Sequence, residues 1–187
     1  MSTPSRKPLL AVRLLLIGGL ALLLSACASY SGRGLIPGTS TLTEAVAVMG
    51  EPAMHWRDPD GREQLAYPRG PQGMQTYMVF VNADGRLDRI EAVLDAEHFY
   101  RIENGRDDQS SVLLLLGPSY PPWTAYFKAR DELVWEWRFC DVSNEVAKFN
   151  VLFDGTTGIV RSSFQRKDRD NFVGFGRRGD IPYTCAR

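Results

Sequence analysis

The 187-residue chain has 22 basic and 22 acidic side chains, a hydrophobic fraction of 44% and an aromatic fraction of 11%. This composition supports one ordinary globular domain or two small ones. It lacks the basic excess that is typical of nucleic-acid-binding proteins, so no nucleic acid is expected among the partners.

The amino-terminal residues have the pattern of an export signal. Three basic residues precede an uncharged apolar run at residues 14–24. A transmembrane helix needs about 20 apolar residues, so this run is short for one. The run ends in Leu24-Ser25-Ala26-Cys27, which resembles the lipobox cleaved by lipoprotein signal peptidase. We interpret residues 1–26 as a lipoprotein signal peptide and Cys27 as the lipid attachment site; the alternative is ordinary cleavage that leaves Cys27 unmodified.

Residues 27–37 are interpreted as a lipidated tether, because they are mostly small and flexible and have little to bury. Ten extended residues reach at most about 35 Å, so the folded part would stay near the membrane surface. Ala28 occupies the position where enterobacterial lipoproteins of the inner membrane carry aspartate. This favours lipid anchoring in the outer membrane, facing the periplasm.

With Cys27 assigned to the lipid, Cys140 and Cys185 remain as an even pair in a compartment that permits disulfides. They are predicted to pair with each other.

The first folded unit is expected at residues 38–94. Thr41 and Glu44 have the spacing of a capping box, which predicts a short helix that ends at Gly50. Strand patterns then follow at residues 65–67, 76–81 and 86–94. The last two flank a turn that contains Asp84-Gly85, which predicts a hairpin.

The second unit is expected at residues 95–165, followed by a carboxyl-terminal tail at 166–187. Asp108 can cap a helix that ends at Gly117-Pro118, and a short extra helix precedes it. Strand patterns follow at residues 133–139, 148–153 and 159–165. The sequence therefore predicts an α+β fold of two tandem units, each a helix followed by a three-stranded antiparallel sheet.

The second unit resembles the SmpA/OmlA (BamE-like) lipoprotein family. The resemblance rests on Phe99-x-x-Ile102-x-x-Gly105, on the helix ending in Leu116-Gly117-Pro118, and on Trp135-x-Trp137 before a hairpin. The first unit repeats the core of this motif with Met49-Gly50-x-Pro52 and Tyr67. BamE has one such unit, and the tandem arrangement is similar to the β-lactamase inhibitor protein, which binds a folded enzyme across its sheet. The resemblance implies a protein-binding role and no cofactor.

Residues with catalytic or metal-binding patterns are few. His55 and His98 are the two histidines, and neither has zinc-ligand spacing, so no catalytic residue, metal or cofactor is assigned. His98 is expected to be an exposed residue in the first turn of a helix, and His55 to lie in a turn or half-buried. Leu133, Trp135, Trp137 and Phe139 would share one strand face, which favours core packing; the alternative is an exposed contact surface.

Possible partner-binding residues lie in two places. Tyr120 and Trp123 flank two prolines, and rigid aromatic side chains on a stiff loop suit partner docking. The alternative is a loop folded over the sheet edge. Arg177 and Arg178 could meet an acidic partner or anionic headgroups, or form part of a solvated face.

The leading functional hypothesis is a lipid-anchored, non-catalytic binding or scaffold protein of the outer membrane. By its resemblance to BamE it would assist β-barrel assembly or envelope integrity, with barrel-assembly proteins as partners. The alternative is a periplasmic module that inhibits or sequesters a folded enzyme. A third hypothesis, an enzyme, would require polar groups that converge in a pocket.

Overall fold

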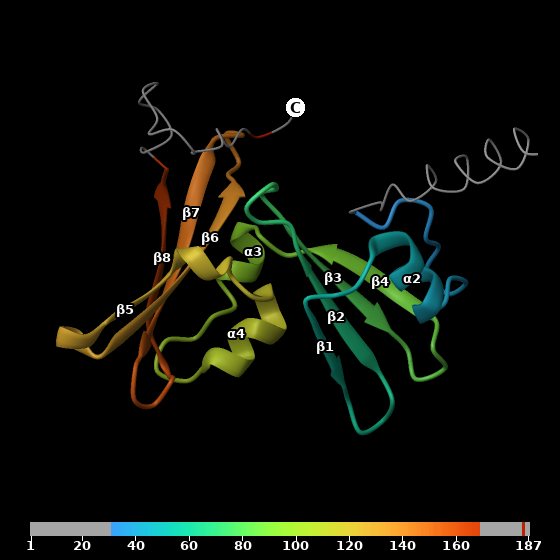
Figure 1. The fold of residues 1–187 in the computed structure, drawn as a ribbon, viewed down its shortest axis with the longest axis horizontal. Helices are drawn as coiled ribbons and strands as arrows, with labels where there is room; N and C mark the ends of the chain where they lie inside the picture. The colour runs from blue at the N-terminus through green and yellow to red at the C-terminus, as the bar shows by residue number, and fades with distance from the viewer. Residues whose placement is uncertain (1–30, 169–184, 186–187) are drawn as a thin grey trace, which may run out of the picture.

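The computed structural model describes residues 31–168 and Cys185. Two four-stranded antiparallel sheets have the strand orders β1-β2-β3-β4 and β5-β6-β7-β8. In Figure 1 the helices α3 and α4 lie between the two sheets, while α2 covers the other face of the first sheet. The fold is α+β, as expected, and the predicted signal peptide and Cys27 lie outside the described residues.

In each half of the chain a helix of eight residues is followed by four strands, and the second half has three further short helices. The first half contains α2 (Leu42–Met49), β1 (Met54–Arg57), β2 (Glu63–Pro68), β3 (Thr76–Val81) and β4 (Leu87–Ala92). The second half contains α3 (Ala96–Phe99), α4 (Gln109–Leu116), η1 (Pro121–Trp123), β5 (Thr124–Phe127), η2 (Lys128–Arg130), β6 (Glu132–Cys140), β7 (Val146–Asp154) and β8 (Val160–Lys167).

Each sheet has four strands, one more than the sequence predicted. The additional strands, β1 and β5, are edge strands of four residues each. All four residues of β5 are exposed, so this strand does not alternate between buried and exposed positions. Such an alternation is the pattern by which a strand is predicted from sequence. Main-chain pairing with β2 and β6 holds these two strands in place. The last strand, β8, also runs to Lys167, beyond the expected boundary at residue 165.

The predicted helix starts are confirmed. The Thr41 hydroxyl accepts a hydrogen bond from the Glu44 N–H at 3.2 Å, and the Glu44 carboxylate accepts from the Thr41 N–H at 2.7 Å. The hydrogen bonds that the Glu44 carboxylate accepts from the Thr41 N–H and from the Thr41 hydroxyl lower the pKa of Glu44. Asp108 caps α4 by accepting from the Ser111 N–H at 2.8 Å. Both helices therefore begin where a side chain satisfies main-chain donors that lack an intrahelical partner.

Replacing Thr41 with alanine is expected to lower the free energy of unfolding by about 1 kcal/mol, because the variant loses one half of the capping box. Urea unfolding of the two proteins measures the difference. A Thr41→Ser variant keeps the hydroxyl and should stay close to the wild type. Equal losses in the two variants would assign the effect to the lost methyl group instead.

Equivalent main-chain hydrogen bonds join each helix-bearing segment to the last strand of its sheet. The four bonds run from Gly38 N to Leu87 O (2.7 Å), from Leu87 N to Ser40 O (2.7 Å), from Gly105 N to Val160 O (2.8 Å) and from Val160 N to Asp107 O (2.8 Å). Each sheet also has a register shift near the end of its third strand, at Phe80/Val81 and at Leu152/Phe153. The two halves thus share local geometry as well as element order.

Within residues 31–168 the buried side chains form three clusters. One lies between α2 and the first sheet and includes Ala45, Leu65 and Val79; Leu35, from the predicted tether, packs against it. A second joins α3 and α4 to the second sheet and includes Phe99 and Phe149. The third occupies the opposite face of the first sheet: Ala66, Met78 and Val93. Both faces of the first sheet are therefore packed.

The aromatic strand face of β6 belongs to the second core cluster. Trp137 and Phe139 are each 2% exposed, and Leu133 and Trp135 pack against the same cluster. The core interpretation of these four residues is confirmed.

The turn after β7 contains a carboxylate with a shifted pKa. Asp154 accepts hydrogen bonds from the Thr157 N–H at 2.7 Å and from the Arg161 guanidinium at 2.6 Å. The Thr157 bond first, and then the Arg161 bond, lower the pKa of Asp154 from 3.8 to about 2. A carboxyl group with a lowered pKa in the folded state contributes stability above its unfolded pKa, and this contribution is lost as the pH falls through the folded pKa.

Replacing Asp154 with asparagine is therefore expected to reduce the loss of stability between about pH 4 and pH 2. Asparagine keeps an oxygen that accepts hydrogen bonds in the turn but does not titrate. Urea unfolding midpoints at both pH values measure the effect. An equally steep decline in the variant would show that Asp154 contributes nothing to the acid dependence.

Candidate partner-binding site at the junction of the two sheets

The carboxyl-terminal end of α4 packs closely on the first sheet. Gly117 has a φ of +70°, and a Cβ atom added there would lie 3.0 Å from Thr76 Cγ2 and 3.3 Å from Ala66 Cβ. The Gln64 side-chain amide donates to the Leu114 carbonyl at 2.6 Å, which satisfies an acceptor in the last turn of the helix. These contacts join the two halves of the chain. They also leave no space for a side chain at position 117.

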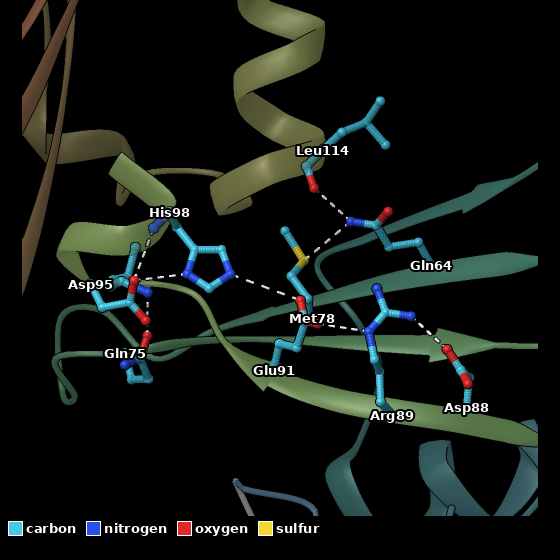
Figure 2. Close-up of polar contacts among 10 residues, drawn as sticks. Gln64, Gln75, Met78, Asp88, Arg89, Glu91, Asp95, His98 and Leu114 are labelled. Carbon is cyan, nitrogen blue, oxygen red and sulfur yellow. Dashed lines mark hydrogen bonds and ion pairs between the residues drawn. The ribbon is translucent and has the colours of Figure 1, made fainter. Parts of the chain in front are cut away.

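Charged side chains join the halves in the region shown in Figure 2. His98 Nδ1 lies 2.8 Å from Asp95 Oδ1, and His98 Nε2 lies 3.8 Å from Glu91 Oε2 on the first sheet. Glu91 also accepts from Arg89 Nε at 2.6 Å. Burial opposes the charge on Asp95, but hydrogen bonds from the His98 N–H and ring outweigh it and lower the pKa of Asp95.

His98 lies in the first turn of α3 as predicted, but the expectation that it is exposed was wrong, because its side chain is only 12% exposed. His55, in contrast, lies on β1, where it is 44% exposed and contacts Glu63 at 2.5 Å.

A polar groove of about 440 Å³ opens beside this charged cluster, and Arg89, Glu91, His98 and Ser111 are among its lining residues. Polar groups do converge here, as the enzyme hypothesis requires. Arg89 and Glu91, however, pair with each other on β4, and Glu91 also lies 3.8 Å from His98 Nε2 across the junction. Their arrangement therefore supports a structural role in holding α3 against β4.

An apolar cavity of about 210 Å³ lies at another part of the junction. It brings together the two predicted partner-binding aromatics, Tyr120 and Trp123, whose rings meet edge to face at 5.1 Å. The Trp123 ring also passes close to the β2–β3 loop, since a Cβ atom at Gly70 would lie 3.3 Å from it. The proline-containing loop thus contacts the first sheet's loop and leaves Trp123 half-buried. Arg177 and Arg178 lie outside the described residues.

Trp137 lines the same cavity and is 2% exposed. Within the described part of the chain its indole Nε1 has no hydrogen-bond acceptor. Leaving a buried donor unpaired costs about 1–3 kcal/mol, so such donors are uncommon and call for a physical explanation. The sequence placed Trp137 in the core but contained no signal for this donor, because it depends on how the two halves pack.

A buried ion-pair network lies next to the cavity on the outer face of the second sheet. Lys148 Nζ lies 3.0 Å from Asp168 Oδ1, and Arg138 Nε lies 3.7 Å from Asp168 Oδ2. The side chains of Lys148 and Asp168 are 5% and 0% exposed. The Arg138 guanidinium lies 4.7 Å from the centre of the Trp123 ring. The network therefore fixes a cation against this aromatic side chain.

The predicted cysteine pair lies at the end of β6. Cys140 and Cys185 form a disulfide with a Cα–Cα distance of 5.7 Å. The link ties the carboxyl-terminal end of the chain to the second sheet.

The rest of the outer face of the second sheet carries exposed apolar side chains. Phe127 on β5 and Phe164 on β8 are 44% and 45% exposed. Val134 and Leu152 are paired across β6 and β7 on this face and are partly exposed. This face is a second surface on which a partner could dock.

Among residues 31–168 and 185, no three His, Cys, Asp or Glu side chains are grouped so as to hold a metal ion. Within this same part of the chain, no helix has the length and apolar character needed to cross a membrane. Comparisons with protein-family models, curated proteins and solved structures found no match.

Proposed function

We propose that this protein is a lipid-anchored, non-catalytic binding protein of the outer membrane that faces the periplasm. By its resemblance to the SmpA/OmlA family, it would assist the assembly of outer-membrane β-barrels or maintain envelope integrity. The lipobox-like Leu24-Ser25-Ala26-Cys27 supports the anchor. The equivalent attachment of both helix-bearing segments to their sheets supports two tandem copies of one ancestral unit, here with four strands each.

The observation that carries the binding role is the aromatic cavity at the junction. Tyr120 and Trp123 lie on a segment stiffened by Pro121 and Pro122, and they line an apolar cavity of about 210 Å³. Binding hot spots are enriched in tryptophan and tyrosine in well-packed pockets, and a stiff loop loses little entropy when it binds. This cavity is therefore the proposed contact site for the partner.

Affinity capture from gently solubilised membranes tests the role, with a carboxyl-terminal tag that leaves Cys185 intact. We expect the wild type to recover barrel-assembly proteins and Trp123→Ala or Tyr120→Ala to recover at least tenfold less, a loss of about 1.4 kcal/mol in binding. Tyr100→Ala is the matched control, because Tyr100 is 82% exposed and lies outside the cavity. Wild-type recovery of no barrel-assembly protein would contradict the proposal.

The anchor has its own test. Cells grown with labelled palmitate should incorporate label into the wild type and not into Cys27→Ala, and the variant should leave the membrane fraction. Incorporation into both proteins would contradict the assignment of Cys27.

A second candidate function is inhibition or sequestration of a soluble periplasmic enzyme. The exposed Phe127 and Phe164 on the outer face of the second sheet favour it, since exposed aromatic groups on a sheet suit a folded partner. In this case the capture experiment would recover one soluble enzyme, and Phe127→Ala with Phe164→Ala would abolish that recovery while Trp123→Ala would not.

A further inference from the structure

We propose that a short tether holds the β2–β3 loop, residues 69–75, against the phospholipid headgroup layer, and that the turns at the other end of the first sheet face away from the membrane. The inference rests on the proposed lipid attachment at Cys27. It goes further by naming the surface of the protein that the bilayer contacts.

The chain between the lipid and the fold is shorter than the sequence indicated. The tether was expected at residues 27–37, but Gly32 is buried, and a Cβ atom added there would collide with the Ile90 side chain. Leu35 packs against the first core cluster and donates its N–H to the Gly32 carbonyl at 3.0 Å. Ser31 is exposed and lies just before this packed segment. Four residue steps separate it from Cys27, which limits their separation to about 14 Å.

The point where the tether meets the fold lies beside the β2–β3 loop. Ser31 lines a cavity of about 570 Å³ together with Arg69, Gln72 and Met74 of this loop. Figure 1 shows the loop at the same end of the first sheet as the start of the coloured chain. A lipid attached at Cys27 therefore keeps the loop close to the membrane surface.

The β1–β2 and β3–β4 turns lie at the opposite end of the first sheet (Figure 1). They are adjacent, because a Cβ atom added to Gly61 would lie 3.6 Å from Ala83 Cβ. The six residues of β2 separate these turns from the β2–β3 loop. Six residues of strand span about 20 Å, which exceeds the reach of the tether. The two ends of this sheet should thus differ in their distance from the lipid.

The side chains around Ser31 suit a headgroup layer. Arg69 is the only charged side chain among the described residues that line the cavity, and Tyr77 contributes an amphipathic ring. Arg33 is exposed next to the packed Gly32. Guanidinium groups bind phosphate oxygens well, and tyrosine is favoured where an apolar region meets water. The surface that the tether brings to the membrane therefore matches phospholipid chemistry.

Quenching by labelled lipids tests the orientation. Gln72→Cys places a thiol in the β2–β3 loop, and Ala83→Cys places one at the opposite end; both positions are exposed. With Cys27 lipidated and Cys140 bonded to Cys185, the introduced thiol is the only one that a thiol-reactive bimane can label. The labelled lipoprotein is reconstituted in phosphatidylcholine vesicles that carry a nitroxide on some headgroups. Since the two ends lie about 20 Å apart, we expect at least about threefold stronger quenching at position 72 than at position 83.

The outcomes separate the orientation from the anchor. Equal quenching at the two positions, or stronger quenching at position 83, in protein that floats with the vesicles would overturn the orientation and leave the anchor in place. Protein that fails to float with the vesicles would overturn the anchor, and the orientation with it.

A longer tether checks the cause of the orientation. Inserting about 20 Gly and Ser residues after Ser29 raises the average reach of the tether to roughly 27 Å. Quenching at position 72 should then fall at least about twofold, because the loop is no longer confined to the headgroup layer. The same residues appended after Arg187 are the matched control and should leave the quenching unchanged. Undiminished quenching with the longer tether would overturn the tether as the cause.

Discussion

Replacing Phe149 with alanine is expected to lower the free energy of unfolding by about 3–5 kcal/mol, the range for large aromatic residues in a core. Phe149 on β7 is 2% exposed, and its ring stacks on Phe99 of α3 at a centroid distance of 3.9 Å. Its ring centroid also lies 6.3 Å from that of Trp137. Removing this ring leaves a cavity between the second sheet and α3 that rigid neighbours cannot fill.

Urea unfolding of the full chain measures this loss, and Phe164→Ala is the matched control. Phe164 lies on the neighbouring strand β8 but is 45% exposed on the outer face. Its removal creates no internal cavity, so we expect a change within about 0.5 kcal/mol. Similar losses in both variants would contradict the assignment of Phe149 to the core and Phe164 to the surface.

The sequence predicts the helix ends well because their determinants are local. Thr41 and Glu44 satisfy each other's main-chain groups within four residues, and Asp108 accepts from the Ser111 N–H at the start of α4. The edge strands β1 and β5 were not predicted, because their determinants are not local. Both strands have only four residues, which is too short for a clear hydrophobic pattern. Each is held in place by pairing with its neighbouring strand. Predicting four strands in each sheet would therefore have required knowing which strands pair.

The candidate site, too, could be predicted from the sequence only where its determinants are local. The prolines beside Tyr120 and Trp123 indicate a stiff aromatic loop from the sequence alone. The cavity does not follow from that loop, because Gly70 and Leu94 complete it from the first half of the chain and the linker. The exposure of His98 was mispredicted because its contact with Glu91 arises only when α3 docks on the first sheet.

Replacing Gly117 with alanine is expected to destabilise the protein through two separate effects. Gly117 has φ +70° and ψ 178°, a conformation that costs a non-glycine residue about 1–3 kcal/mol. The new Cβ atom would also lie 3.0 Å from Thr76 Cγ2 and 3.3 Å from the Met78 Cε atom. Overpacking at such a site adds about 1–3 kcal/mol, because α4 must move away from the first sheet.

Comparing Gly117→Ala with Gly50→Ala isolates the effect of overpacking. Gly50 ends α2 with φ +85° and ψ −171°, so alanine meets the same backbone cost there. No atom lies within 4 Å of its added Cβ, however, so nothing is overpacked. We expect Gly117→Ala to lose about 1–3 kcal/mol more than Gly50→Ala in urea unfolding. Because Thr76 also lines the junction cavity, displacing α4 should weaken partner recovery in Gly117→Ala alone. Equal stability losses and equal recovery in the two variants would mean that the close approach of α4 to the first sheet contributes neither to stability nor to binding.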